Sequence, residues 1–230
     1  MPLSSVDHID GVLPVNQERS RNARDRLLQA GDRVFARMGY DAAHVTDIAA
    51  AADCSVGSFY RRFRDKEAFF RALHHQFTVR YQENIERFFT LLEWDDEPTT
   101  VVVSTLIANT SRVMHRHHGF FRALFQRSLA GAGADYWPAM RAGTELQGQL
   151  LARFIAARGE GKSENLEQNC IFALRAIDGA IVHAILNDGP HYDPQFAQQS
   201  LARMALAFLG LPTEPLRVVD VDLMAKPRRK

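Results

Sequence analysis

The chain has 230 residues, of which 46% are hydrophobic and 24% charged, so it can form one large domain or two modest ones with buried cores. Its formal net charge of +1 excludes a strongly basic or strongly acidic protein, although basic residues outnumber acidic ones between residues 17 and 71. Two cysteines, Cys54 and Cys170, are too few for a disulfide framework, and we expect both to be reduced. Because we find neither a signal peptide nor an apolar run of about 20 residues, we expect a cytoplasmic protein with no membrane partner.

After an irregular N-terminal segment, residues 1–16, the sequence up to about residue 63 predicts one longer helix and two short ones. A first helix has Leu27, Gly31, Val34 and Met38 at helical spacing and ends near Gly39. A short helix, 45–52, follows His44 as its N-cap, with Asp47 near the positive end of the helix dipole. After a tight turn, 53–55, the hydroxyl of Ser55 is expected to cap another short helix that ends near residue 63.

From residue 65 onward the sequence predicts longer helices. Asp65 is expected to cap a helix over 66–93, and Pro98 to begin another. The stretch "TTVVVSTLI", 99–107, has high strand propensity, but we predict a helix because nothing else in the chain could pair with a lone strand. The last two helices are predicted over 163–187 and 194–209, followed by an irregular tail, 212–230. The sequence therefore predicts an all-α fold.

Two short helices joined by a turn and packed on a longer first helix make a helix-turn-helix, a common DNA-binding unit. Gly57 and Ser58 lack bulk, so the start of the second short helix could approach DNA closely and present free N–H groups to phosphate. Tyr60 and Arg61 would project from its exposed side, and Lys66 offers an ammonium group just beyond. Apolar residues at the spacing that would lock the two helices together are Ile48, Ala49, Ala52, Cys54 and Phe59.

Residues 24–70 resemble the DNA-binding domain of the tetracycline-repressor (TetR) family of bacterial regulators. The resemblance is carried by Phe35, Gly39-Tyr40, Val45-Thr46-Asp47-Ile48-Ala49, Ser55-Val56-Gly57-Ser58-Phe59-Tyr60, Phe63 and Asp65-Lys66-Glu67. It implies a helix-turn-helix DNA-binding domain over 17–65 and a helical effector-binding and dimerisation domain over 66–211. It also implies a ligand-responsive repressor of a palindromic double-stranded DNA operator.

The resemblance assigns DNA-contacting roles position by position. Tyr60, Lys66 and Thr46 match positions that contact the phosphate backbone, and Arg61 is a candidate for a base or phosphate contact. His44, Val56 and Arg62 depart from the common pattern, so the operator sequence cannot be transferred. The full predicted DNA-binding set is Thr46, Ser55, Val56, Gly57, Ser58, Tyr60, Arg61 and Lys66.

Large rings between residues 77 and 154 either pack as core or line a cavity for a small apolar or aromatic effector. The candidate effector residues are Phe77, Tyr81, Met114, Phe121, Phe125, Trp137 and Asp178, with Asn109 and His183 as further polar groups. Small and bulky apolar stripes on the last two helices predict a homodimer interface. Its candidate residues are Ala173, Ile177, Ala180, Ile181, Ala184, Leu201, Met204 and Phe208.

Other functional classes find less support. His115, His117 and His118 cluster, but their spacing does not place three imidazoles on one helical face, so no metal site is predicted. We find no nucleophile–base arrangement and no phosphate-binding glycine loop, so we expect neither an enzyme nor a bound cofactor. An architectural DNA-binding protein remains an alternative, although it would leave the long C-terminal region, with its balanced charge, without a role.

Overall fold

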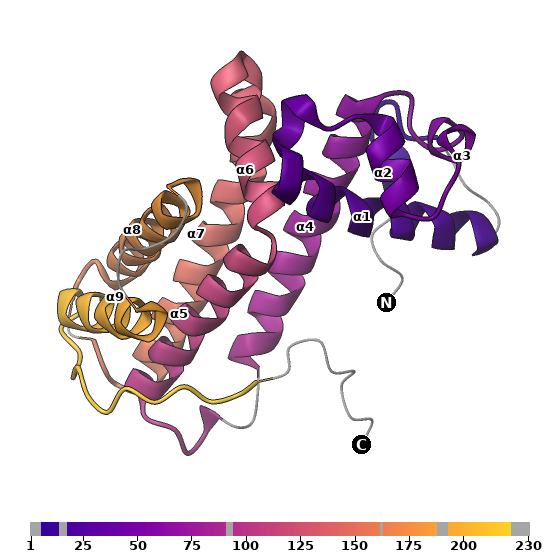
Figure 1. Ribbon diagram of the computed structural model, residues 1–230. Coiled ribbons are helices and arrows are strands. Elements are labelled where there is room, and N and C mark those ends of the chain that lie inside the picture. The colour runs from indigo at the N-terminus through magenta and orange to yellow at the C-terminus, as the bar shows by residue number, and fades with distance from the viewer. Residues whose placement is uncertain (1–5, 14–17, 91–93, 162, 188–192, 222–230) are drawn as a thin grey trace. The chain divides into compact units, whose positions relative to one another are not determined.

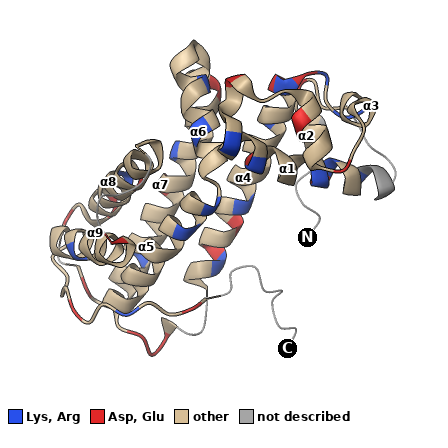
Figure 2. Ribbon diagram, viewed as in Figure 1, with Lys and Arg blue, Asp and Glu red and all other residues tan. Residues whose placement is uncertain are grey.

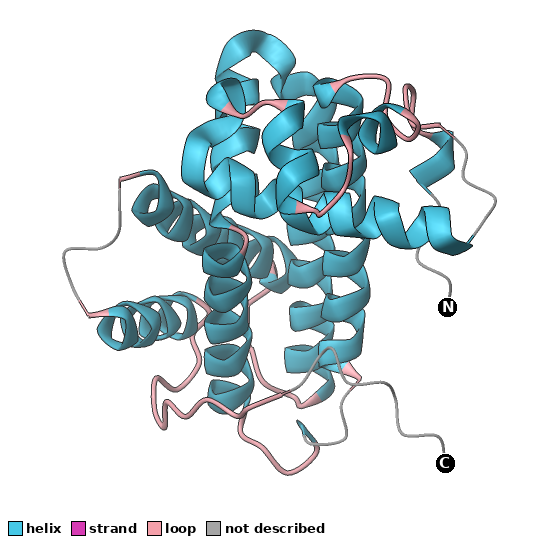
Figure 3. Cartoon of the chain, turned by 45° about the vertical axis from the view of Figure 1, so that its right-hand side comes forward, coloured by secondary structure: helices cyan, strands magenta, loops and turns pink. Residues whose placement is uncertain are grey.

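The computed structural model describes residues 6–13, 18–90, 94–161, 163–187 and 193–221. These residues form helices joined by loops and turns, which confirms the all-α prediction (Figures 1 and 3). The stretch 99–107 is helical, as predicted. The elements are η1 (Val6–His8), α1 (Glu18–Ala42), α2 (Val45–Ala51), α3 (Val56–Tyr60), α4 (Lys66–Phe89), α5 (Thr99–Arg116), α6 (His118–Arg127), the π-helical η3 (Ser128–Ala132), α7 (Gly133–Ala157), α8 (Leu166–Leu186) and α9 (Pro194–Phe208).

The chain forms two compact units, each assembled from two separate stretches. The N-terminal unit contains residues 1–80 and 117–139, and the C-terminal unit contains residues 81–116 and 140–230. The predicted boundary at 65/66 marks the start of α4, whereas the compact units divide within α4 and again within α7. Helix α6 therefore belongs to the same unit as the helix-turn-helix.

The N-terminal unit has an aromatic core beneath α2 and α3. Phe35, Phe59, Phe63 and Phe69 are fully buried, and their rings meet at centroid distances of 5–6 Å, for example 5.1 Å between Phe63 and Phe69. Such pairs contribute beyond the apolar area that they bury. Helix α1 contains a kink at Gly39, whose φ of 74° lies in the left-handed region that the sequence pattern predicted.

Helix α6 packs closely against α1 in this unit. A Cβ atom at Gly119 would lie 2.3 Å from the backbone of Asp32 and of Ala36, so only glycine permits this approach. The carboxylate of Asp32 accepts hydrogen bonds from the backbone N–H of Phe120 at 2.9 Å and from Nδ1 of His117 at 2.7 Å. Asp32 thereby ties the start of α6 to the middle of α1.

Residues 6–13 also belong to the N-terminal unit, in contrast to the irregular segment expected over 1–16. Val6 and Val12 are buried, and Val12 forms an isolated antiparallel β-bridge with Phe63. The backbone N–H of Leu13 donates to the carbonyl of Arg62 at 2.8 Å. This segment therefore packs beside the chain that follows the second short helix.

The C-terminal unit is organised around α5. Every residue of this helix from Thr99 to Ser111 is buried, so it is covered on all sides. Helices α8 and α9 both pack against it. Helix α7 approaches α8 at Gly148, where a Cβ atom would lie 2.8 Å from the Cα of Ile171.

Helix α8 is long and apolar enough to meet the length and composition criteria for a membrane span, with a mean hydropathy of 1.5 over its best window. The sequence analysis expected no such run. Alanine, isoleucine and leucine raise the hydropathy of this helix, and only a third of that window is buried within the chain. Buried helices of water-soluble proteins meet the same criteria, so we interpret α8 from its packing.

The chain after α9 follows an extended path over 212–221. The backbone N–H of Val219 donates to the hydroxyl of Thr105 at 3.0 Å, and Arg217 forms an ion pair with Glu97. This part of the predicted irregular tail is thus held on α5 and on the loop before it. The basic end, 226–230, lies outside the described residues.

Candidate nucleic-acid interface and effector region

Local hydrogen bonds build the helix-turn-helix as the sequence predicts. The carboxylate of Asp47 accepts from the backbone N–H of His44 at 2.8 Å, and the hydroxyl of Ser55 accepts from the backbone N–H of Ser58 at 3.1 Å. Asp53 adopts a positive φ of 51° in the turn between α2 and α3. The side chains of Ile48 and Phe59 are fully buried beneath the two helices.

Six of the predicted DNA-contacting residues lie on the surface of this motif. Tyr60 is 50% exposed and Val56 is 38% exposed. Around Gly57 there is open space, because an added Cβ atom would meet only the hydroxyl of Ser55 at 3.9 Å. The other exposed members of the set are Thr46, Ser55 and Arg61. The start of α3 therefore has little steric bulk, and its end presents a phenol and a guanidinium. Figure 2 shows further basic residues along α1.

Ser58 lies inside the motif instead of on its surface. Its side chain is buried, and its hydroxyl and carbonyl oxygens accept hydrogen bonds from Nη1 of Arg62 at 2.8 and 2.6 Å. Arg62 is itself 6% exposed, and burial lowers the pKa of its guanidinium. The two residues stabilise the end of α3, which leaves the Ser58 side chain poorly placed for a direct DNA contact.

The side chain of Lys66 is hydrogen-bonded to backbone carbonyls of the same chain, at the end of α1. Its ammonium group donates to the carbonyl oxygens of Tyr40 at 2.8 Å, Ala43 at 2.9 Å and Asp41 at 3.3 Å, and it lies 4.5 Å from the centroid of the Tyr40 ring. Burial lowers the pKa of this ammonium group. All three N–H donors are engaged, so Lys66 is arranged to cap the end of α1.

Glu67 forms a polar cluster that the sequence analysis did not identify. Its carboxylate accepts hydrogen bonds from the phenol of Tyr40 at 2.8 Å and from the phenol of Tyr136, and it pairs with Arg127 at 2.7 Å. Although burial opposes the effect, these partners lower the pKa of Glu67, while burial together with Glu67 raises the pKa of both tyrosines. The only sequence signal was the position of Glu67 directly after Asp65 and Lys66.

The predicted effector residues divide between the two units. Phe77, Phe121, Phe125 and Trp137 belong to the N-terminal unit, where they form two aromatic pairs. Phe77 lies 5.4 Å from Phe121, and Phe125 lies 5.1 Å from Trp137. Met114, Tyr81 and Asp178 belong to the C-terminal unit. The candidate effector set therefore includes residues of both units, and the cavity that we expected stays a prediction.

Tyr81 and Asp178 lie in a polar interior of the C-terminal unit. The phenol of Tyr81 donates to Gln147 at 3.0 Å, and the hydroxyl of Thr144 donates to the carboxylate of Asp178 at 2.9 Å. Burial raises the pKa of Asp178 to about 6, partly offset by the Thr144 hydrogen bond, and burial raises the pKa of Tyr81 as well. Of the two further polar groups, Asn109 is buried with an unpartnered Nδ2, and His183 is exposed.

The predicted dimer residues divide by face. Ala173, Ile177 and Ile181 are buried within the chain, because this stripe of α8 faces inward. On the outer face, Met204 is 64% exposed and Phe208 is 49% exposed. Ala180 is exposed, while Ala184 and Leu201 are partly buried. Two exposed rings missed by the sequence analysis, Phe172 and Phe196, extend the same apolar surface.

Comparison with known proteins supports the assignment of the N-terminal unit. The family described as bacterial regulatory proteins, tetR family, matches residues 27–73. The HTH-type transcriptional repressor DhaR of Mycobacterium sp. (strain GP1) is 48% identical over 46 residues. That match covers 20% of this chain and 23% of DhaR, so it concerns the helix-turn-helix alone.

Solved structures of similar fold cover most of the chain. The fatty acid degradation regulator FadR from Bacillus halodurans has a TM-score of 0.65 at 18% identity, covering 84% of this chain and 97% of that one. FadR from Bacillus subtilis, in complex with stearoyl-CoA, has a TM-score of 0.61 at 16% identity, covering 80% and 98%. At these identities the likeness shows the fold. The helix-turn-helix therefore matches the tetR family of bacterial regulatory proteins, and the chain as a whole shares the fold of these solved regulators.

Proposed function

We propose that the protein is a homodimeric transcriptional repressor that binds a palindromic DNA operator and is released by a small apolar or aromatic effector. The observation that carries the proposal is the exposed surface of α3, which begins without bulky side chains and presents Tyr60 and Arg61 at its end. The matched relative DhaR is a transcriptional repressor. We further propose that the protein acts in the cytoplasm, without enzymatic activity or a bound cofactor.

Each exposed residue of this surface has a proposed role. The phenol of Tyr60 and the hydroxyl of Thr46 would bind backbone phosphate and so fix the register on DNA. Arg61 would reach a base edge or a phosphate, since a guanidinium can bind guanine with two hydrogen bonds. Ser55, Val56 and Gly57 would allow the helix to approach the major groove.

The outer face of α8 and α9 is the proposed homodimer interface. Large exposed side chains such as Phe172 and Met204 would be buried there, and the small residue Ala180 would allow two helices to approach closely. A two-fold dimer would place two recognition helices about 34–36 Å apart, one turn of DNA. The two-fold symmetry of the dimer is the reason that we expect a palindromic operator, and the spacing sets the distance between its half-sites.

The effector is proposed to act through helices that contribute to both units. Helix α4 begins with Lys66 at the helix-turn-helix and continues past Phe77 to Tyr81, so a ligand that displaces these rings would shift the recognition helices. A coupling of about 1–3 kcal/mol gives a 5–150-fold loss of operator affinity. A solved structure of similar fold, Bacillus subtilis FadR, is in complex with stearoyl-CoA, which supports a ligand-responsive role.

Footprinting on DNA beside the protein's own gene tests this proposal. We expect protection of a palindromic site, and weaker binding by about tenfold in Tyr60→Phe or Arg61→Ala, because each removes a contact of about 1–2 kcal/mol. Arg153→Ala, an exposed arginine of α7 in the C-terminal unit, is the matched control and should bind normally. Diffuse protection without a palindrome would instead indicate an architectural protein, and equal losses in the control would contradict the assigned surface.

A further inference from the structure

We propose that residues 9–13, which we call the N-terminal strap, position the recognition helix α3 for operator binding through backbone hydrogen bonds, without contacting DNA themselves. The inference rests on the proposed function, because it assigns a further role in the same DNA-binding unit. The sequence analysis placed these residues in an irregular segment, whereas the structure bonds them to the chain that directly follows α3. Strap and helix belong to the same compact unit.

Helix α3 needs support from outside itself. It spans five residues, Val56–Tyr60, and an isolated helix shorter than about 12 residues is marginal in water. The hydroxyl of Ser55 caps its start, and the backbone N–H of Arg61 closes its last turn. The direction in which α3 presents Tyr60 and Arg61 therefore depends on what holds the chain that follows.

Two backbone hydrogen bonds join the N-terminal strap to that chain. The N–H of Leu13 donates to the carbonyl of Arg62 at 2.8 Å, and the N–H of Arg64 donates to the carbonyl of Gly11 at 2.8 Å. The two bonds flank Phe63, which is fully buried in the aromatic core beneath α3. The strap thus fixes the path of the chain on both sides of a core residue.

Arg62 connects this support to α3. Its carbonyl accepts from Leu13, while its own N–H donates to the carbonyl of Phe59 at 2.8 Å. Its side chain turns back and donates from Nη1 to the carbonyl and hydroxyl oxygens of Ser58 at 2.6 and 2.8 Å. A residue that is held at its N–H, its carbonyl and its side chain has little freedom, so a shift of the strap should move the last turn of α3.

Close packing fixes the N-terminal strap on α4 as well. Gly11 has a φ of 79°, and a Cβ atom added there would lie 2.7 Å from the Cβ of Ala68, so only glycine permits this approach. Val12, the next residue, is 6% exposed and forms the isolated bridge with Phe63. The strap therefore links the end of α3 to the first turn of α4.

The ion pairs of the N-terminal strap contribute less than its backbone bonds. The carboxylate of Asp10 lies 3.1 Å from the guanidinium of Arg64 and 3.7 Å from that of Arg71. The side chain of Asp10 is 77% exposed, and ion pairs in water of this kind stabilise a fold only weakly. We therefore expect the strap to tolerate loss of this charge but not loss of the Leu13 N–H.

Operator titrations with two variants of one residue test the proposal. Leu13→Pro removes the N–H that donates to Arg62, whereas Leu13→Ala keeps it and is the matched control for the 40% exposed side chain. We expect Leu13→Pro to bind the operator about 5-fold more weakly, the effect of one lost hydrogen bond, and Leu13→Ala to bind normally. The salt slope and the affinity for unrelated DNA should not change, because no phosphate contact is lost.

Two results of these titrations would overturn the proposal. Normal operator affinity in Leu13→Pro would show that α3 does not depend on the strap, and a reduced salt slope would show that the strap binds DNA directly. A wild-type chain without any operator would instead contradict the proposed function.

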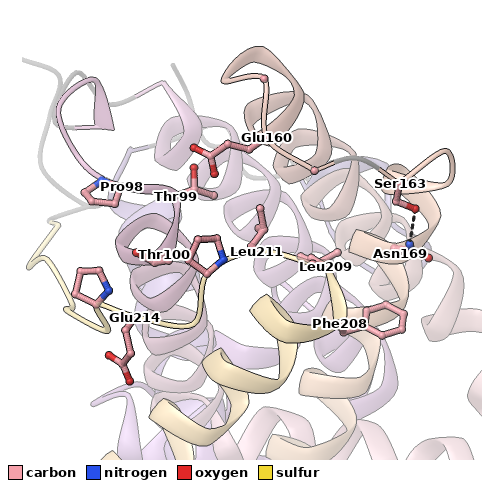
Figure 4. Close-up of a pocket in the computed structure, with 15 residues that line it drawn as sticks. Pro98, Thr99, Thr100, Glu160, Ser163, Asn169, Phe208, Leu209, Leu211 and Glu214 are labelled. Carbon is pink, nitrogen blue, oxygen red and sulfur yellow. Dashed lines mark hydrogen bonds between the residues drawn. The ribbon is translucent and has the colours of Figure 1, made fainter.

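A second pair of variants separates charge from backbone bonding. Asp10→Asn should change operator affinity by less than about 2-fold. Its matched control is Glu214→Gln, since Glu214 pairs with Arg203 at 2.9 Å and lines a pocket of the C-terminal unit (Figure 4). The control should bind the operator normally. A larger loss in Asp10→Asn than in Leu13→Pro would overturn the proposal, because charge would then position α3.

Hydrogen exchange on the DNA-free chain measures the position of α3 without an operator. In Leu13→Pro the amide protons of Arg61 and Phe63 should exchange about 5-fold faster than in Leu13→Ala, while those of α5 should not change. Gly11→Ala, which keeps every N–H of the strap but displaces it from Ala68, should give the same local increase. Equal exchange in all variants, or an increase throughout both units, would overturn the proposal.

Discussion

Replacing Lys66 by alanine should lower the free energy of unfolding but leave the salt dependence of DNA binding nearly unchanged. The family resemblance predicts a phosphate contact for this lysine, and its loss would lower the salt slope by about one unit. In the structure the ammonium group instead donates to the carbonyls of Tyr40, Asp41 and Ala43. Those carbonyls lie where α1 ends, so the substitution removes a cap.

The expected loss follows from the three hydrogen bonds. Hydrogen bonds to a charged group contribute about 1.5–3 kcal/mol each in buried surroundings. Lys66 is only partly buried, so water can replace part of this interaction, and we expect a total loss of about 2 kcal/mol. For a chain of this size that corresponds to a fall in melting temperature of roughly 4–8 °C.

Arg61→Ala is the matched variant. Arg61 is exposed at the end of α3 and contributes its backbone N–H to the cap there, so removal of its side chain should leave stability unchanged. It should reduce the salt slope by about one unit if it meets phosphate. Urea unfolding and operator titrations at several salt concentrations measure both quantities. A stable Lys66→Ala variant with a reduced salt slope would refute the capping role.

Three further predictions concern the core, the interior carboxylate and the dimer. Glu67→Gln should lower the free energy of unfolding by about 1–2 kcal/mol, because the amide cannot pair with Arg127, and an unchanged urea midpoint would contradict the cluster. The folded pKa of Asp178, about 6, lies above its ordinary value of 3.8, so ionisation opposes folding, and this group's stability contribution falls as pH rises from about 4 through 6. Asp178→Asn should therefore raise the free energy of unfolding at pH 7.5 by up to about 2 kcal/mol and remove that pH dependence. Urea unfolding at pH 5 and pH 7.5 measures both effects. A lower free energy of unfolding at both pH values would show that the carboxylate is needed. Ala180→Arg should convert the dimer to monomer by light scattering, whereas a wild-type chain that is monomeric at micromolar concentration would reject the interface.

The helix-turn-helix was predictable because its determinants are local. Asp47 and Ser55 cap helices within three residues of themselves, and Asp65 caps α4 through the backbone N–H of Ala68 at 2.7 Å. Capping side chains, turn residues and apolar spacing can all be recognised over a few positions of sequence. The same is true of the start of α9, where Asp193 accepts from the backbone of Gln195 and Phe196.

Roles that depend on distant partners were not predictable. Lys66 and Glu67 meet residues more than 20 positions away, so their charge suggested surface positions although both are partly buried. The orientation of α8 was ambiguous for another reason. Its small stripe and its bulky stripe are both apolar, and only packing against α5 determines that Ile177 faces inward while Ala180 faces outward.

The contribution of α6 to the N-terminal unit limits how this chain can be divided or recombined. A fragment that ends at residue 65 would retain the recognition helix but lose the contacts of His117 and Phe120 with Asp32. During synthesis, the complete unit can assemble only after residue 139 has left the ribosome. A chimaera that exchanges operator specificity should therefore transfer 6–80 together with 117–139, or keep the native Asp32 and Ala36 on the face of α1 that receives Gly119.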